Sequence, residues 1–205
     1  MTAELIITFG IALLATFLGT IPFGPINLAV VNITLKKGYP EGFRFSLGAS
    51  LVEILEVVLA IAFGSVIQSL LSENLVLQIV IIIVFIVVGL YYLLSIQRPV
   101  LKSRIKIKVS PFVKGILVAL ANPQAIPFWV FLLTFISQII TLNLAGIGLL
   151  LFLVGVFLGK LAALLLFAYS SKFLRPKLEL SCKIINKTLG VILIAIGIFQ
   201  AIKCF

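Results

Sequence analysis

The stretch PFGPIN, residues 22–27, interrupts an apolar run that extends from Leu5 to Val31. Its two prolines lack the backbone donors that a continuous helix needs, so the sequence predicts a helix break there. A second stretch of this kind, NPQAIP at residues 122–127, interrupts the apolar run from Phe112 to Ile136. In lipid, the carbonyl groups freed by such breaks must find partners in neighbouring helices, water or a bound ligand. The two breaks are therefore the first candidates for a binding site.

The composition is that of a membrane protein. Of the 205 residues, 62% are hydrophobic and 11% are charged, whereas apolar residues make up about 45–50% of a soluble domain. A helix needs about 20 apolar residues to cross a ~30 Å hydrocarbon core. Runs of that kind lie at residues 5–34, 44–66, 75–96, 111–136, 144–170 and 184–202. We therefore predict an all-α, polytopic membrane protein with six transmembrane helices.

The formal net charge of +10 follows from membrane topology. Basic residues cluster in the connections after the first, third and fifth runs, whereas the connections at residues 68–74 and 137–143 contain no Lys or Arg. By the positive-inside rule, the basic connections are cytoplasmic and both termini lie outside the cytoplasm. Anionic membrane lipid is an expected minor partner of these basic residues, and nucleic acid is not an expected partner.

Residues that commonly hold metals or carry redox chemistry are scarce. The chain has no His, and Cys182 and Cys204 have neither metal-ligand spacing nor a predicted location on the same side of the membrane. We therefore expect no metal and no cofactor. The N-terminal residues MTAE carry an acid in place of the basic region of a signal peptide, so the first run is expected to remain as a spanning helix.

Three charged residues lie deep inside the apolar runs, away from their ends. Glu53 and Glu56 are three residues apart in the second run and share a helix face, and Lys160 lies in the fifth run. A charge in the middle of a membrane helix costs about 2.5–3.5 kcal/mol on insertion scales. Such residues therefore need a polar partner, a water-filled cavity or, for the acids, a proton.

The two halves of the chain have the same plan: a broken segment, a glycine-rich segment with a buried charge, and a plain segment. Because each half crosses the membrane an odd number of times, we predict inverted repeats at residues 1–97 and 111–205, joined by a basic cytoplasmic linker at 98–110. Aligning Gly48 with Gly155 places Glu53 on Lys160. This alignment motivates the hypothesis that Glu53 and Lys160 form an ion pair in mid-membrane, or exchange it for contacts with substrate.

The order of these features resembles the LysE/RhtB amino-acid exporter family. The residues that carry the resemblance are Gly24-Pro25, Gly38, Gly42, Gly48 and Asn122-Pro123, within six apolar segments that cover essentially the whole chain. The resemblance implies an exporter in the bacterial or archaeal inner membrane that is driven by an ion gradient and expels amino acids or similar small zwitterions. The family's Pro-Gly-Pro motif corresponds to Gly24-Pro25, with the first proline displaced to position 22 by Phe23. Glu53 or Glu56 resembles an acidic residue of relatives that handle cationic amino acids.

We interpret the chain as a secondary active transporter. Discontinuous helices present positive N-terminal ends to a substrate carboxylate, and C-terminal ends or freed carbonyls to an ammonium group or coupling ion. The candidate substrate-binding residues at the two breaks are Pro22, Gly24, Pro25, Asn27, Asn122, Pro123 and Pro127. The candidate ion-coupling residues are Glu53, Glu56 and Lys160, and a proton is the expected coupling ion.

Other functions stay open. The superfamily has a cation-resistance branch, so a cation or heavy-metal exporter is an alternative, although two glutamates would make a sparse metal site. A non-transporting scaffold subunit would use Gly155 and Gly159 as a helix-packing face, and a homodimer is possible. An enzyme is not expected, because Ser46, Ser50 and Glu53 offer at most a Ser–Glu pair without a His.

Overall fold

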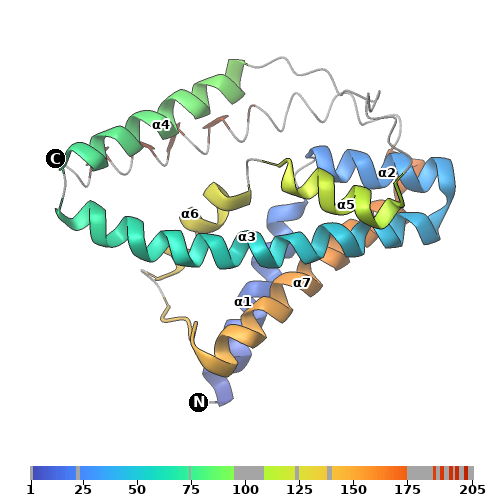
Figure 1. The fold of residues 1–205 in the computed structure, drawn as a ribbon, viewed down its shortest axis with the longest axis horizontal. Coiled ribbons are helices and arrows are strands. Elements are labelled where there is room, and N and C mark those ends of the chain that lie inside the picture. Colours follow the sequence, from blue (N-terminus) through green and yellow to red (C-terminus); the bar gives the residue numbers. More distant parts are fainter. Residues whose placement is uncertain are drawn as a thin grey trace. The chain divides into compact units, whose positions relative to one another are not determined.

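The fold is described from a computed structural model of the chain. The structure describes residues 2–21, 24–73, 75–94, 109–122, 125–137 and 140–174, together with 187, 190–191, 194–195, 197–198 and 201–202. Every element within these ranges is a helix (Figure 1). The all-α class predicted from the sequence is therefore confirmed for the described part of the chain.

The helices follow the predicted apolar runs, with interruptions where proline was expected to cause them. Their bounds are α1 Thr2–Thr20, α2 Pro25–Lys37, α3 Tyr39–Glu73, α4 Leu75–Leu94, α5 Pro111–Leu120, α6 Ala125–Ser137, α7 Gly146–Tyr169 and α8 Ser171–Leu174.

The first predicted break is confirmed by the end of α1 at Thr20 and the start of α2 at Pro25. It is shorter than expected, because Pro25 occupies the first position of α2, where the backbone donor that proline lacks has no partner within the helix. The sequence predicted one span over residues 5–34, whereas residues 3–20 of α1 are long and apolar enough to cross a membrane without α2.

The second predicted break is confirmed by the end of α5 at Leu120 and the start of α6 at Ala125. Pro127 is the third residue of α6, so it lies in the first turn of a helix and outside the break. With 10 and 13 residues, α5 and α6 are about 15 and 20 Å long at 1.5 Å per residue. Neither of them reaches the thickness of a hydrocarbon core.

Gly38 and Pro40 lie at the junction between α2 and α3. Gly38 ends α2 with φ of 90°, a left-handed conformation that favours glycine. Pro40, two residues later, lies in the first turn of α3, which begins at Tyr39. A proline is tolerated there because the first turn of a helix does not need its backbone donors. The second run is consequently a helix of 35 residues.

Three of the described helices are long and apolar enough to cross a membrane, over residues 3–20, 39–64 and 146–169. These helices make the chain a membrane protein; the count of six spans stays a prediction. Six successive crossings would send the first and fifth runs in the same direction. Consistent with that order, Gly155 faces Phe9 and Ala12, and Gly159 faces Leu13 and Thr16, so α1 and α7 run parallel.

The chain forms two compact units, one of residues 1–62 and 101–176 and the other of residues 63–100 and 177–205. Each unit draws residues from both predicted halves, and the inverted repeat stays a prediction. In the second unit, the backbone of α4 at Gly89 closely approaches Gly190 and Ile194. The first unit contains every intramembrane charge discussed above.

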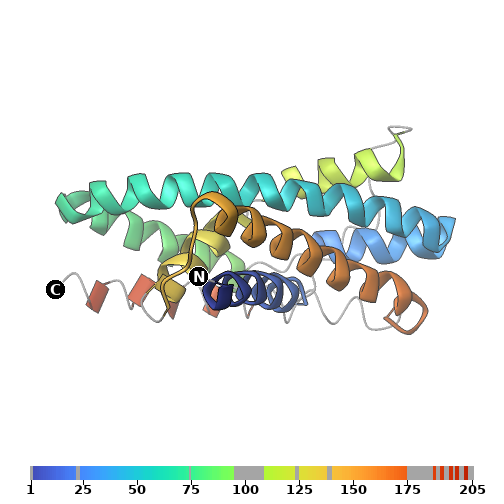
Figure 2. The same ribbon diagram turned by 90° about the horizontal axis from the view of Figure 1, so that it is seen from below.

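Glycines allow close helix contacts in the first unit. Methyl groups at Gly155 and Gly159 of α7 would meet the backbone of α1, and one at Gly48 of α3 would meet the backbone of α5 at Phe112. Figure 2 shows α7 between α1 and the first part of α3. The Gly155–Gly159 face is therefore packed within the chain.

Candidate functional site

An apolar cluster in the first unit surrounds the charged residues. It is built from Ala12 of α1, Val57 and Ala60 of α3, Trp129 of α6, and Phe152 and Val156 of α7. Four helices thus meet around one indole ring, which is completely buried. A charge placed against this cluster is shielded from water and must be neutralised by other protein groups.

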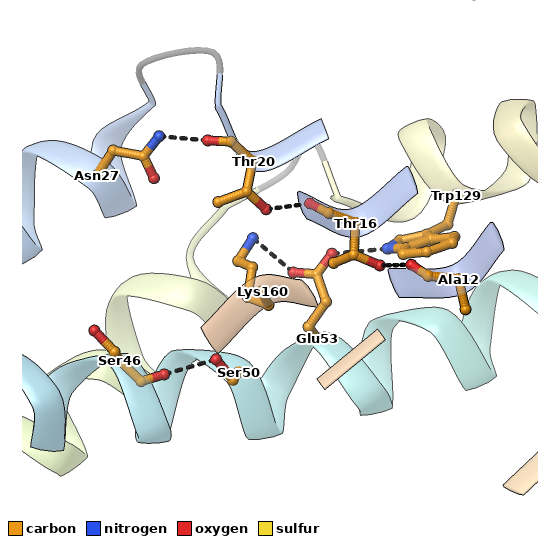
Figure 3. A network of polar contacts seen from close by, with 9 residues as sticks. All are labelled: Ala12, Thr16, Thr20, Asn27, Ser46, Ser50, Glu53, Trp129 and Lys160. Carbon is orange, nitrogen blue, oxygen red and sulfur yellow. Dashed lines mark hydrogen bonds and ion pairs between the residues drawn. The ribbon is translucent and has the colours of Figure 1, made fainter. Parts of the chain in front are cut away.

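Glu53 and Lys160 form a buried ion pair in the first unit. The Lys160 Nζ atom lies 2.8 Å from Oε2 of Glu53, and the two residues are only 6% and 3% exposed. The contact joins α3 to α7 (Figure 3). The alignment of the two halves predicted a contact between Glu53 and Lys160, and the structure contains this contact.

The second oxygen of the same carboxylate is also bound. The indole Nε1 of Trp129 donates a hydrogen bond of 2.7 Å to Oε1 of Glu53. One carboxylate therefore joins three helices: α3, which carries it, α6 through the indole and α7 through the ammonium group (Figure 3). Both Glu53 oxygens have a partner, so this residue is held in a single orientation.

Glu56 is the acid of the site that keeps a free oxygen. It lies one turn beyond Glu53 on α3 and is 5% exposed. Its Oε2 atom is buried and has no hydrogen-bond partner among the described residues. A buried carboxylate oxygen without a donor is unfavourable unless it takes up a proton or a donor-bearing ligand. The geometry thus separates the two glutamates into one that is fully engaged and one that can accept a ligand.

Polar groups along α1 lead from the cluster to the first break. The Thr16 hydroxyl donates to the Ala12 carbonyl at 2.6 Å, and the Thr20 hydroxyl donates to the Thr16 carbonyl at 2.7 Å. The Asn27 side chain, in the first turn of α2, then donates to the carbonyl of Thr20 at 2.6 Å. This carbonyl ends α1 and has no partner within that helix. Asn27 therefore closes the first break (Figure 3).

The helices next to the two breaks, α1 and α6, meet at Gly19 and Phe128. Gly19 is the penultimate residue of α1, and a methyl group added there would overlap the tip of the Phe128 ring in α6. Asn122, which follows α5, donates its backbone N–H to the Ala119 carbonyl at 2.8 Å. Its side-chain Oδ1 is buried without a hydrogen-bond partner among the described residues. A second unsatisfied acceptor thus lies at the second break.

Most of the predicted site residues can be placed. Gly24 and Pro25 start α2, Asn27 follows in its first turn, Asn122 lies at the second break, and Pro127 lies within α6. Pro22 and Pro123 are outside the described residues. Glu53 and Lys160 are in direct contact, with Glu56 on the same helix as Glu53. Whether any of these residues binds a substrate or couples an ion stays a prediction.

Sequence reasoning missed three contributors: Trp129, Gly19 and the Thr16–Thr20 pair. Trp129 is the one tryptophan of the chain, and a buried indole N–H needs an acceptor. Its position directly after a break, in a protein with two intramembrane acids, was a usable signal. Thr16 and Thr20 are one turn apart on the segment that leads to the first break, but threonine is too common in membrane helices to attract notice.

The serines near the acids are occupied within their own helix. The Ser46 hydroxyl donates to the Gly42 carbonyl at 2.9 Å and the Ser50 hydroxyl to the Ser46 carbonyl at 2.8 Å. Such bonds to the preceding turn are common for serine in membrane helices. In the structure, neither hydroxyl donates its proton to a carboxylate that would act as a base.

A protein-family model described as "LysE type translocator" matches residues 17–203. Comparison with curated proteins and with solved structures found no match.

Proposed function

Because the chain belongs to the LysE type translocator family, we propose that it is a secondary active transporter that exports amino acids or similar small zwitterions. Family membership and the apolar helices make it a membrane translocator. The substrate class, the direction and the driving ion are our proposals. We further propose that it acts in the inner membrane, with its basic connections in the cytoplasm and both termini outside.

The free carboxylate oxygen of Glu56 is the observation that carries this proposal. Because Glu53 and Lys160 neutralise each other at 2.8 Å, the remaining acceptor beside them is the buried Oε2 atom of Glu56. Such an atom suits a substrate ammonium group or a proton. We assign Glu56 that exchangeable role and assign Glu53 and Lys160 the role of a fixed neutral pair that joins α3 to α7.

The helix ends at the breaks supply the complementary charges. The N-terminal ends of α2 and α6 carry partial positive charge, which suits a substrate carboxylate. The buried Oδ1 atom of Asn122 offers an acceptor at the second break. A small zwitterion has an anionic and a cationic group a few bonds apart, so it fits a site with a helix N-terminus and a free carboxylate.

The proposal is tested by efflux from proteoliposomes. Purified protein is reconstituted into vesicles loaded with a labelled amino-acid mixture, and release is followed with and without an inwardly directed proton gradient. We expect the gradient to accelerate release of some amino acids. We also expect Glu53→Gln to abolish the gradient-coupled part, because it removes the carboxylate that pairs with Lys160 at 2.8 Å.

Glu41→Gln is the matched control. It makes the same chemical change on the same helix, but Glu41, whose side chain is 24% exposed, pairs with Arg44 in the first turn of α3 and not with Lys160. Normal gradient-coupled efflux by Glu53→Gln would refute the role of the ion pair. Wild-type vesicles that release no amino acid would refute the proposed substrate class.

Two other functions, a scaffold subunit and an enzyme, can be distinguished from export by experiment. A scaffold subunit would leave cells equally tolerant of toxic amino-acid analogues whether or not the protein is expressed, whereas an exporter would raise their tolerance. An enzyme would convert the labelled amino acid and not only release it. We propose that the released label is chemically unchanged.

A further inference from the structure

The indole of Trp129 is held on three sides. It is completely buried, and it makes edge-to-face contacts with Phe128 at a centroid distance of 5.6 Å and with Phe152 of α7 at 5.9 Å. Its N–H is directed at Oε1 of Glu53, 2.7 Å away. A ring packed in this way cannot turn without displacing its neighbours. The donor therefore has a fixed position relative to the carboxylate.

Trp129 also lies close to both breaks. It is the fifth residue of α6, which begins directly after the second break. The preceding residue, Phe128, extends its ring tip into the space left by Gly19, one residue before the end of α1. Two consecutive residues of α6 therefore contact Glu53 of the ion pair and the last turn of α1 (Figure 3 shows the indole and the pair).

We infer that Trp129 is a positioning residue of the transport cycle: it fixes the Glu53 carboxylate toward Lys160 and transmits displacement of α6 at the breaks to that ion pair. The inference rests on the proposed export function. A neutral donor such as the indole orients a carboxylate without adding charge, so the Glu53–Lys160 pair remains neutral. When α6 moves, the hydrogen bond at Oε1 has to lengthen or carry Glu53 with it.

The first experiment compares two variants in the proteoliposome assay. Trp129→Phe keeps an aromatic ring and removes the N–H, whereas Phe152→Leu removes a packing partner of the indole and keeps the N–H. A hydrogen bond to a charged group is worth about 1.5–3 kcal/mol, or roughly tenfold or more in rate. We expect Trp129→Phe to lower the maximal efflux rate by at least about tenfold with little change in KM, and Phe152→Leu to have a smaller effect on that rate.

The second experiment uses the fluorescence of Trp129 and needs no replacement of it. Because the chain has one tryptophan, emission excited at the red edge of the absorption band comes from this site alone. We expect Glu53→Gln to shift the emission maximum, because the anion facing the indole nitrogen is removed. Glu41→Gln, which makes the same change away from Trp129, is expected to leave the maximum in place.

The outcomes separate this inference from the export proposal. Equal losses of maximal rate in Trp129→Phe and Phe152→Leu would overturn it, because Trp129 would then act by packing alone. An unshifted emission maximum in Glu53→Gln would overturn it even if Trp129→Phe failed to fold. Either result leaves export by the wild-type protein standing, whereas a wild-type protein without amino-acid efflux overturns both.

Discussion

The Nζ atom of Lys160 lies 2.8 Å from Oε2 of Glu53, and this contact joins α7 to α3 next to Trp129 of the apolar cluster. Desolvating two charges is unfavourable, and their attraction compensates only when the geometry is good and the remaining atoms are hydrogen-bonded. The Trp129 N–H meets that condition at the second oxygen of Glu53. The pair is therefore expected to be sensitive to the loss of either partner.

Replacing Lys160 with Met leaves the Glu53 charge buried with one neutral donor. Breaking a buried pair in this way lowers the free energy of unfolding by about 3–5 kcal/mol. We expect the double variant Glu53→Gln/Lys160→Met to regain part of this loss, because no unpaired charge remains. Thermal unfolding in detergent measures both variants, with the exposed Lys172→Met as control. Additive losses would show that the two side chains do not interact.

The contact of α7 with α1 depends on the absence of a side chain at Gly159. A methyl group there would meet the backbone carbonyl of Leu13, and overpacking of this kind costs about 1–3 kcal/mol. Gly10→Ala in α1 is the matched control, because the space beside Gly10 is open. We expect Gly159→Ala to lower the unfolding temperature and Gly10→Ala to maintain or raise it. A stable Gly159→Ala protein would contradict the close packing of α1 and α7.

The first break should depend on the Asn27 amide. Asn27→Leu has a similar volume but no donor, so the Thr20 carbonyl loses its 2.6 Å partner. An unsatisfied buried acceptor costs about 1–3 kcal/mol. Asn32→Leu makes the same change on α2 at a half-buried residue for which the described part of the chain shows no side-chain hydrogen bond. Equal unfolding temperatures for the two variants would argue against Asn27 as the closure of the break.

The contact of α1 with α6 beside the two breaks is tested at Gly19. Alanine normally stabilises a helix by about 0.5–1 kcal/mol relative to glycine, but a methyl group at Gly19 would overlap the ring tip of Phe128. We therefore expect Gly19→Ala to lower the unfolding temperature, and a second change, Phe128→Leu, to reduce that loss. If Gly19→Ala is as stable as the wild type and Phe128→Leu has the same effect in both backgrounds, the two residues are not in contact.

The sequence identified the breaks well and the helix lengths less well. Proline and glycine act on the local backbone, so the interruptions after Thr20 and Leu120 were predictable. Pro127 was misplaced because the effect of a proline depends on its position within a helix, and it lies in the first turn of α6. That α1 alone is long enough to span a membrane was not apparent from the sequence, because the apolar residues continue on both sides of the break.

The candidate site was predictable in part. The cost of a buried charge pointed to Glu53, Glu56 and Lys160, and the comparison of the two halves paired Glu53 with Lys160. The sequence could not show which glutamate has partners at both oxygens, because this depends on where the Trp129 N–H points. The contact of Gly19 with Phe128 likewise depends on tertiary packing between segments far apart in the chain.

The central claim is that the unpaired Oε2 atom of Glu56 exchanges the coupling proton or the substrate amine while Glu53 stays bound to Lys160. The most direct measurement is efflux by Glu56→Gln in proteoliposomes, with and without a proton gradient, beside wild type and Glu41→Gln. We predict that Glu56→Gln folds with the ion pair intact but shows no acceleration by the gradient, whereas both reference proteins do. Acceleration of Glu56→Gln equal to that of the wild type would contradict the account.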